Sequence, residues 1–367
     1  MTVLARAAPA RADTATARVM ICDDSLVIRG AISRMLEADP AIKVVAKVSN
    51  GRAAIEELRR TQVDVLVLDI EMPVLDGMAA LPLLLRADPG LRVIMASTLT
   101  TRGADIAMQA LRLGAADYVP KPSSIGTAGD DVFRREIIAK VKGLARLRKR
   151  ATGPGPSASA GAAAPIALRP GSRNPPRLLA VGSSTGGPQA LFALFQGLGR
   201  AVDVPIVLTQ HMPATFTPIL AEHITRLGGM PCHEARDGEM LTPGRIYLAP
   251  GDRHLLIEGV RGGMQARLST DPPENFCRPS VDPMLRSAAR ACDGRVLVAM
   301  LTGMGHDGLA GTRQVVEAGG SAIAQDEATS VVWGMPGAVA QAGLCTAVLP
   351  LPGIAPKLLD LLRSKRA

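Results

Sequence analysis

Residues 178–188 of this 367-residue chain read LLAVGSSTGGP and carry the strongest indication of its fold. Residues 178–181 are all apolar, and such a run predicts a parallel strand that is buried on both faces. Glycines two residues before and after Ser184 give the spacing Gly-x-Ser-x-Gly, which permits a sharp turn that exposes the hydroxyl. Pro188 is compatible with the first turn of a helix. The stretch therefore predicts a strand, a tight turn and a helix in succession, as in an α/β fold.

Two further strands of the same half are predicted at residues 205–209 and 295–301. The first is followed by His211 and the second by Asp307. Because the carboxyl ends of parallel strands lie at one edge of a sheet, we expect Ser184, His211 and Asp307 to meet there. A serine becomes nucleophilic when an imidazole accepts its proton and a carboxylate orients that imidazole. The order Ser, His, Asp differs from that of the α/β-hydrolases, so the pattern predicts similar chemistry on a different fold.

Each assignment has an alternative. Glycine-rich turns also bind phosphate, so the turn by itself leaves a nucleophile and an anion site open, although the sequences GK[ST] and GxGxxG are absent. Ser183 is the alternative nucleophile, but only Ser184 has glycine at both two-residue offsets. The alternative base is His306, and the alternative carboxylates are Asp282 and Asp326. Three further histidines are expected at the surface or in structural hydrogen bonds, namely His223, His233 and His254.

The first half alternates short β-rich runs with helical patterns. The predicted strands are residues 18–22, 44–48, 63–68, 92–96 and 118–119. The predicted helices are residues 26–37, 52–60, 78–86, 104–113 and 132–147. Five βα units of this length predict an open parallel sheet whose ligand site lies at the carboxyl ends of the strands.

Three carboxylates are predicted to meet at that edge. Asp23 and Asp24 follow the first strand and Asp69 ends the third, and these strands are neighbours in such a sheet. Close negative charges repel one another unless a cation joins them, and carboxylate oxygens suit Mg²⁺. A carboxylate beside Mg²⁺ can attack a phosphoryl group, to which Ser97 and Lys121, after the fourth and fifth strands, can donate. The alternative is that these aspartates are ordinary turn residues.

A segment of low complexity separates the two halves. Of the 26 residues in 151–176, 20 are Ala, Gly, Pro or Ser, and none is acidic or aromatic. Such a segment buries too little surface to offset its ordering entropy. We predict a disordered leader at 1–16, a first domain at 17–145, a flexible basic linker at 146–176, a second domain at 177–358 and a tail at 359–367. Within the second domain, residues 245–249, 255–257 and 265–268 predict a shorter, partly antiparallel set of strands.

The composition excludes several classes of protein. With 47% hydrophobic and 20% charged residues, the chain can bury a large core, so global disorder is excluded. Nine basic residues between 137 and 177 account for the net charge of +9, and the remaining 33 basic residues balance 33 acidic ones. This local excess, with only 2% aromatic residues, argues against a nucleic-acid-binding face. No apolar run approaches the ~18 residues that span a membrane. Five cysteines without CxxC spacing predict buried, reduced thiols in a cytoplasmic protein.

Four motifs stand at the strand ends of the first half. They are Asp23-Asp24-Ser25, Asp69-Ile70-Glu71-Met72-Pro73 with Asp76-Gly77, Ser97-Thr98, and Tyr118-Val119-Pro120-Lys121-Pro122. With them, residues 17–140 resemble a bacterial two-component receiver domain, which has a flavodoxin-like fold. The resemblance implies that Asp69 accepts phosphate from a histidine kinase, and that Ser97 and Lys121 contact the phosphoryl group. It also implies a Mg²⁺ site at Asp24, Asp69 and the backbone carbonyl of Glu71, with Asp23 in the outer cluster. Tyr118 matches an aromatic position that shifts on activation, although a half-buried strand aromatic has the same appearance in a sequence.

The second half carries motifs at residues 182–187, 209–213, 248–251 with His254, 278–282 and 301–308. With them, residues 177–345 resemble the doubly wound α/β catalytic domain of the chemotaxis response-regulator protein-glutamate methylesterases, which also deamidate receptor glutamines. The resemblance implies that Ser184 is the nucleophile, His211 the general base and acid, and Asp307 the orienting carboxylate. Backbone N–H groups near Thr185 and Met304 are the implied oxyanion donors, and no metal or other cofactor is required at this site. Residues 278–282 have no assigned role.

The order of receiver, linker and catalytic domain implies a phosphorylation-controlled hydrolase. Its implied substrate is a γ-glutamyl methyl ester of a methyl-accepting chemoreceptor, and its implied phosphodonor is a chemotaxis histidine kinase. The receiver without phosphate is expected to obstruct the catalytic cleft. We expect a cytoplasmic protein with no nucleic-acid partner and no direct membrane insertion. Two alternatives are a DNA-binding response regulator, which predicts a basic recognition helix after the linker, and a catalytically silent protein that docks on receptors or kinases.

Overall fold

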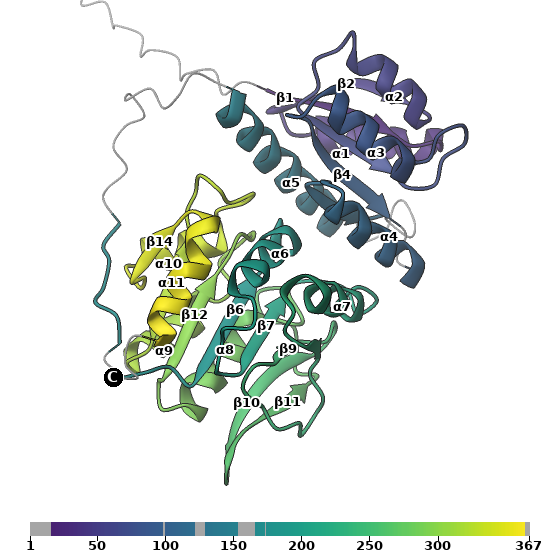
Figure 1. The fold of residues 1–367 in the computed structure, drawn as a ribbon. Helices are drawn as coiled ribbons and strands as arrows, with labels where there is room; N and C mark the ends of the chain where they lie inside the picture. Colours follow the sequence, from purple (N-terminus) through teal and green to yellow (C-terminus); the bar gives the residue numbers. More distant parts are fainter. Residues whose placement is uncertain (1–15, 98–99, 122–128, 153–165, 173, 364–367) are drawn as a thin grey trace, which may run out of the picture.

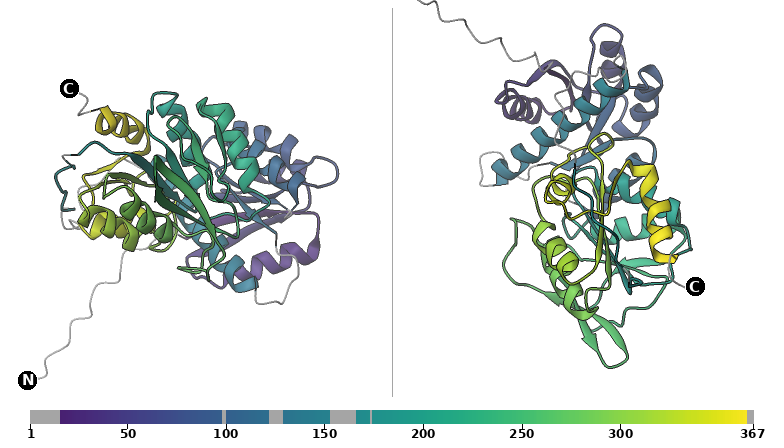
Figure 2. Two further views of the ribbon diagram at one scale, coloured as in Figure 1. Left: turned by 90° about the horizontal axis from the view of Figure 1, so that it is seen from below. Right: turned by 90° about the vertical axis from the view of Figure 1, so that its left-hand side faces the viewer.

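Two α/β halves make up the protein in a computed structural model that describes residues 16–97, 100–121, 129–152, 166–172 and 174–363. Figures 1 and 2 show two separate sheets, each covered by helices on both faces. The predicted leader at 1–16 lies outside the described residues except for its last residue. None of the helices in the described part of the chain combines the length and the apolarity needed to cross a membrane.

The first sheet has five parallel strands in the order β2-β1-β3-β4-β5. The strands are β1 (Ala17–Cys22), β2 (Ile42–Val48), β3 (Val65–Asp69), β4 (Arg92–Ser97) and β5 (Asp117–Pro120). The helices are α1 (Leu26–Glu37), α2 (Gly51–Leu58), α3 (Gly77–Ala87), α4 (Thr101–Arg112) and α5 (Gly129–Thr152). Apolar residues of α1 and α5 pack on one face of the sheet, and those of α2, α3 and α4 pack on the other. This strand order confirms the flavodoxin-like prediction.

Side-chain caps explain where four of these helices begin. Ser25 accepts a hydrogen bond from the backbone N–H of Ile28 at the start of α1, and Asn50 does the same for α2. Asp76 and Thr100 cap α3 and α4 in the same way. Each such cap satisfies a backbone donor that the helix leaves unpaired and contributes about 0.5–2 kcal/mol.

Helix α5 extends past the end expected from the sequence, from residue 147 to Thr152. The reason is that its basic side chains find carboxylates in the folded protein. Arg148 pairs with Asp88 at 2.8 Å, and Arg146 pairs with Glu327 of the second half at 2.8 Å. Some residues of the predicted linker are also packed, since the backbone N–H of Arg169 donates to the Cys345 carbonyl at 2.8 Å.

The second sheet has seven parallel strands in the order β14-β13-β12-β6-β7-β9-β8. The strands are β6 (Leu178–Ser183), β7 (Ile206–Gln210), β8 (Cys232–Glu234), β9 (Ile246–Leu248), β12 (Val296–Met300), β13 (Ser321–Gln325) and β14 (Ala347–Leu349). Helices α6 (Gly187–Leu198), α7 (Thr217–Gly228) and α11 (Leu351–Arg363) cover one face, and α8 (Val281–Ala291), α9 (Leu309–Glu317) and α10 (Met335–Gln341) cover the other. This is the doubly wound fold that was predicted.

Two details of the second half differ from the sequence prediction. Only β10 (His254–Val260) and β11 (Gly263–Ser269) form an antiparallel hairpin, whereas the strand expected at 245–249 joins the parallel sheet as β9. That strand is short and flanked by Pro and Gly, so its partner is not legible from its own residues. The predicted tail at 359–367 also begins within α11, which continues to Arg363. The helix continues because its apolar side chains pack against α6.

Candidate functional site

The second sheet reverses its strand order between β6 and β12, which is where a doubly wound sheet forms a ligand site. Ser184 follows β6 directly, and its backbone N–H donates to the Thr302 carbonyl after β12 at 3.0 Å. Gly186 has a φ of 74°, and a Cβ there would lie 2.5 Å from Val331. A side chain at Gly187 would lie 1.9 Å from the Gln210 amide. The tight turn at the serine therefore needs both glycines.

The imidazole and the carboxylate predicted from sequence meet in the structure. His211 Nε2 lies 2.7 Å from Asp307 Oδ2, and Asp307 is 2% exposed. Burial lowers the pKa of His211, but the hydrogen bonds to Asp307 and Cys277 outweigh it, so the pKa is raised above its ordinary value. Burial likewise raises the pKa of Asp307, but hydrogen bonds from its partners hold that pKa below its usual range. The arrangement allows the carboxylate to orient a basic imidazole.

The Asp307 carboxylate sits at the N-terminus of α8. It accepts hydrogen bonds from Ser280 Oγ at 2.7 Å and from the backbone N–H groups of Val281 at 2.6 Å and Asp282 at 3.1 Å. The Asn275 side-chain amide adds a bond of 2.9 Å. Helix N-termini favour anions, and hydrogen bonds to a charged group contribute about 1.5–3 kcal/mol each. The motif at 278–282, which had no assigned role, thus holds the Asp307 carboxylate.

Ser184 lies on the neighbouring strand end but is not hydrogen-bonded to the pair. The His211 backbone N–H donates to the Ser183 carbonyl at 3.2 Å, whereas Ser184 Oγ makes no hydrogen bond among the described residues and His211 Nδ1 lies 3.4 Å from Cys277 Sγ. Hydrogen bonds of this kind often tighten only with substrate present. The backbone N–H groups of Thr185 and Met304 also donate to no group in the described part of the chain, which leaves both available for an oxyanion.

The rival residues have structural roles or lie apart from the pair. Ser183 is fully buried and donates to Gln210 at 2.7 Å. Asp282 accepts from the Gly311 N–H at 2.6 Å, and Asp326 caps a turn at Thr329. His306 is exposed. Of the other histidines, His233 pairs with Glu239, His254 bonds to Pro272 and Ser280, and His223 is buried between the two halves.

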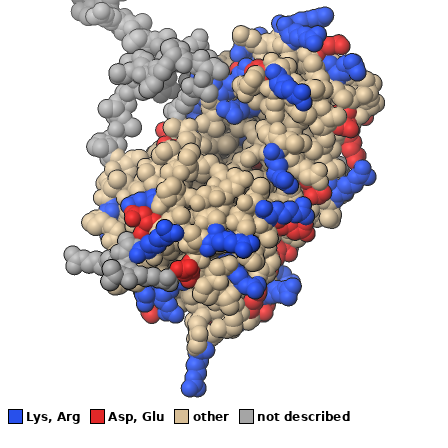
Figure 3. Space-filling model, in the orientation of Figure 1, with Lys and Arg blue, Asp and Glu red and all other residues tan. Residues whose placement is uncertain are grey.

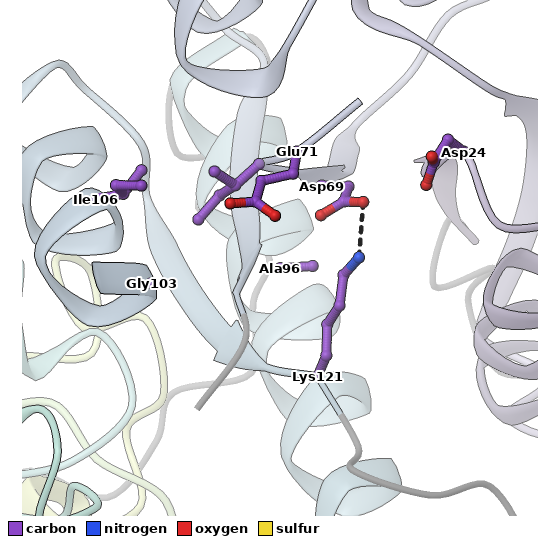
Figure 4. A pocket seen from close by; sticks show the side chains of 8 residues that line it. Asp24, Asp69, Glu71, Ala96, Gly103, Ile106 and Lys121 are labelled. Carbon is purple, nitrogen blue, oxygen red and sulfur yellow. Dashed lines mark ion pairs between the residues drawn. The ribbon is translucent and has the colours of Figure 1, made fainter. Parts of the chain in front are cut away.

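The predicted carboxylate cluster of the first half is present at the carboxyl edge of β1 and β3. Oxygens of Asp23, Asp24 and Asp69 lie within 4.8 Å of one another. Lys121 Nζ lies 2.6 Å from Asp69 and 2.8 Å from Asp23. A cavity of about 350 Å³ opens beside them, and Figure 4 shows Asp69 and Lys121 joined across it with Glu71 at its wall. Burial is the largest cause of a raised Asp69 pKa, and the Lys121 ammonium partly offsets it.

The cluster fits a hard cation. Asp23 Oδ2 is buried and faces the Lys121 ammonium at 2.8 Å, with oxygens of Asp24 and Asp69 close by. Oxygen-only ligands of this kind suit Mg²⁺. Ser97 points elsewhere, because its hydroxyl donates to the Gly103 carbonyl of α4 at 2.7 Å. For Ser97 to donate to a phosphoryl group, its hydroxyl would have to give up the hydrogen bond to the Gly103 carbonyl.

Contacts between the two halves connect the sites, and the sequence analysis missed them. Asp117 of β5 accepts a hydrogen bond from the Gly186 N–H, two residues after Ser184, at 3.0 Å. Tyr118 is buried and stacks on Phe216 of the second half, with ring centroids 4.8 Å apart. In Figure 1, α4 and α5 lie along the side of the second half that carries α6 and α7. No local pattern around Asp117 marks it, since its partner is 69 residues away.

Comparisons place both halves among known proteins. Residues 179–358 match the CheB methylesterase family, and residues 19–128 match the response regulator receiver domain. The protein-glutamate methylesterase/protein-glutamine glutaminase of group 2 operon from Rhodospirillum centenum is 55% identical over 364 residues, covering 92% of each chain. The protein-glutamate methylesterase/protein-glutamine glutaminase of Azospirillum brasilense is 55% identical over 358 residues, covering 92% of this chain and 91% of that one. The crystal structure of the Thermotoga maritima CheB methylesterase catalytic domain is 39% identical, with a TM-score of 0.50, and covers 51% of this chain and 98% of that chain.

Proposed function

The chain belongs to the CheB methylesterase family and carries a response regulator receiver domain, and on this basis we propose that it is a receiver-regulated protein-glutamate methylesterase and protein-glutamine glutaminase. Its substrates are γ-glutamyl methyl esters and glutamines of a methyl-accepting chemoreceptor. The observation that carries the proposal is the buried Asp307–His211 pair beside the serine turn. We further propose that it acts in the cytoplasm, where the receptor presents those side chains.

The proposed reaction uses residues of the second half alone. Ser184 Oγ attacks the ester carbonyl while His211 accepts the serine proton. Backbone N–H groups of Thr185 and Met304 stabilise the tetrahedral oxyanion. His211 then returns the proton to the leaving oxygen, methanol departs and an acyl-Ser184 remains. Water, deprotonated by His211, releases the glutamate and restores the serine. On a glutamine the same steps release ammonia.

Control by phosphate is proposed for the first half. Asp69 accepts a phosphoryl group from a chemotaxis histidine kinase. Mg²⁺, held by Asp24, Asp69 and the Glu71 carbonyl with Asp23 in the outer cluster, would neutralise charge on that group when bound. Lys121 pairs with the phosphoryl oxygens, as it pairs with the carboxylates now.

The contacts between the halves support a closed, less active arrangement without phosphate. Asp117 accepts a hydrogen bond from Gly186, which lies two residues after Ser184 and immediately before α6, and Asp117 is on the strand that leads to Lys121. Lys121 directly follows β5, so a change in its ion pairs at the phosphorylation site can shift β5 and with it Asp117. Phosphorylation then shifts the population toward separated halves.

The observations do not favour the two alternative functions. A protein that only docks would not require a buried carboxylate held by five hydrogen-bond donors against an imidazole. A DNA-binding regulator needs a basic face, whereas Figure 3 shows basic side chains next to acidic ones over the face drawn. No nucleic-acid partner and no membrane insertion are therefore proposed.

Methanol release from methylated receptor, with and without acetyl phosphate, tests the proposal. Ser184→Ala is expected to lower turnover by roughly 10⁴- to 10⁶-fold, as deletion of a triad nucleophile does. Ser183→Ala is the matched control, because Ser183 is the adjacent serine with a buried hydroxyl. A loss of less than tenfold in Ser184→Ala would remove Ser184 from the role.

A further inference from the structure

A two-residue turn beside the triad holds a phenylalanine in a backbone conformation that disfavours it. The backbone N–H groups of Glu274 and Cys277 each donate to the other residue's carbonyl, at 3.1 and 3.0 Å. The residues between them have positive φ angles, 54° at Asn275 and 63° at Phe276. Turns of this kind favour asparagine followed by glycine, because larger side chains crowd the backbone at positive φ. Phe276 therefore carries strain that a glycine would relieve.

The other three residues of the turn are fixed against the catalytic group. Both carboxylate oxygens of Glu274 accept from the Arg286 guanidinium of α8, at 2.5 and 2.7 Å. The Asn275 amide donates to the Asp307 carboxylate at 2.9 Å. Cys277 Sγ lies 3.4 Å from Nδ1 of the triad imidazole. These contacts over-determine the backbone of the turn, which is how a folded protein retains a strained residue.

Nothing in the fold accounts for a phenylalanine at this place. The side chain is 95% exposed even with the receiver docked, so it adds no core packing. A second large apolar side chain, Met304, is 39% exposed on the loop after β12. Its neighbour Gly303 lies against Ser184, since a Cβ at Gly303 would come within 3.0 Å of the serine Cβ. Exposed apolar side chains thus stand on loops at both the imidazole and the nucleophile.

The charged residues on either side of the turn's tip are paired within the protein. Glu274 pairs with Arg286, and Arg278 pairs with Asp252 at 2.8 Å. With these two side chains engaged, Phe276 offers an apolar contact between them. Such a surface fits a partner segment with apolar side chains next to its reacting group better than a strongly charged segment.

We propose that Phe276 is a specificity-determining residue that contacts the chemoreceptor segment carrying the glutamyl methyl ester. This inference rests on the esterase function proposed above. The phenyl ring packs on apolar side chains that flank the esterified glutamate and so holds the ester over Ser184. An aromatic ring on a turn that is already fixed loses little conformational freedom on binding.

Phe276→Gly separates this role from a structural one. The variant relieves the positive-φ strain, so its melting temperature is expected to equal or exceed that of the full-length wild-type protein. The KM for methylated receptor is expected to rise roughly 10- to 100-fold, as loss of a buried aromatic contact predicts, with little change in kcat. Hydrolysis of a small probe, the γ-methyl ester of N-acetylglutamate, is expected to stay at the wild-type rate, since this probe has no flanking segment.

Two further variants serve as controls. Phe276→Tyr keeps the ring and is expected to keep the receptor KM within about twofold of the wild type. Val74→Gly removes another exposed side chain at positive φ, 70°, from the receiver half, and is expected to leave the receptor KM unchanged.

A failure of the proposed role of Phe276 can be told apart from a failure of the proposed esterase function. An unchanged receptor KM in Phe276→Gly would overturn the inference. A lower melting temperature together with slower hydrolysis of the small probe would also overturn it, because it would make Phe276 a structural residue. If the wild-type protein itself released no methanol from receptor, the esterase function would be refuted instead.

Discussion

Gln189 provides the sharpest test of how the receiver is held against the catalytic half. It lies on α6, five residues after Ser184, and its side-chain amide reaches across to the receiver. Both hydrogens of the amide are used, one to the Leu111 carbonyl at 2.5 Å and one to the Ala115 carbonyl at 2.6 Å. Gln189→Ala removes both bonds without touching the triad, so it should weaken the closed arrangement alone.

The free energy that the closed arrangement loses in Gln189→Ala can be calculated from those two hydrogen bonds. Each net hydrogen bond contributes about 0.5–1.5 kcal/mol, so the closed state should lose about 1–3 kcal/mol relative to the separated one. A change of that size shifts the closing equilibrium roughly 5- to 150-fold. Methanol release without phosphodonor should rise by up to this factor, and it cannot exceed the rate of the phosphorylated protein.

The assay is methanol release from methylated receptor, expressed as a fraction of each variant's own rate with acetyl phosphate. This ratio removes any effect of the substitution on the chemical step. Gln196→Ala is the matched control, because Gln196 lies on the same helix, is exposed, and its side chain makes no hydrogen bond within the described residues. An unchanged ratio in Gln189→Ala would refute the reasoning that these bonds hold the receiver in place.

Three other predictions concern the phosphorylation site and the triad. Asp69→Asn should abolish labelling by acetyl phosphate while methanol release continues at the unstimulated rate, and labelling that persists would move the phosphoacceptor elsewhere. Chelation by EDTA should block stimulation by acetyl phosphate but spare unstimulated hydrolysis, whereas a loss of both would place a metal in the ester reaction. Because Asp307 raises the His211 pKa and the base must be neutral, methanol release should rise with pH through that pKa. Asp307→Asn should shift this rise to lower pH and cut turnover roughly 10⁴-fold, and an unshifted pH profile would count against His211 as the base.

Much of the fold is legible in local patterns. Apolar runs of four or five residues between turn residues predict buried parallel strands, and all five strands expected in the first half are present. The carboxyl ends of parallel strands share an edge, so residues placed directly after them could be assigned to one site. That reasoning brought Asp23 and Asp69 together, and it brought His211 to Asp307 although 96 residues separate them.

The ends of helices and strands were harder to predict from the sequence where contacts with distant residues determine them. Helix α5 continues past residue 147 because Arg148 meets Asp88, which lies 60 residues earlier. The strand β9 is only three residues long and joins the parallel sheet through its pairing with β7 and β8. Neither partner can be read from the segment itself.

The residues that follow each strand could be assigned to the carboxyl edge of a sheet from the amino-acid sequence, because the period of an apolar pattern and the order of strands in a parallel sheet are local and topological properties. The surroundings of those residues became known only from the folded protein. The donors that hold Asp307, the contact of Asp117 with the serine turn and the outward Phe276 all depend on turn angles and on the packing of distant segments. Such contacts require atoms to meet within a few tenths of an ångström, and that precision arises only when the whole core is packed.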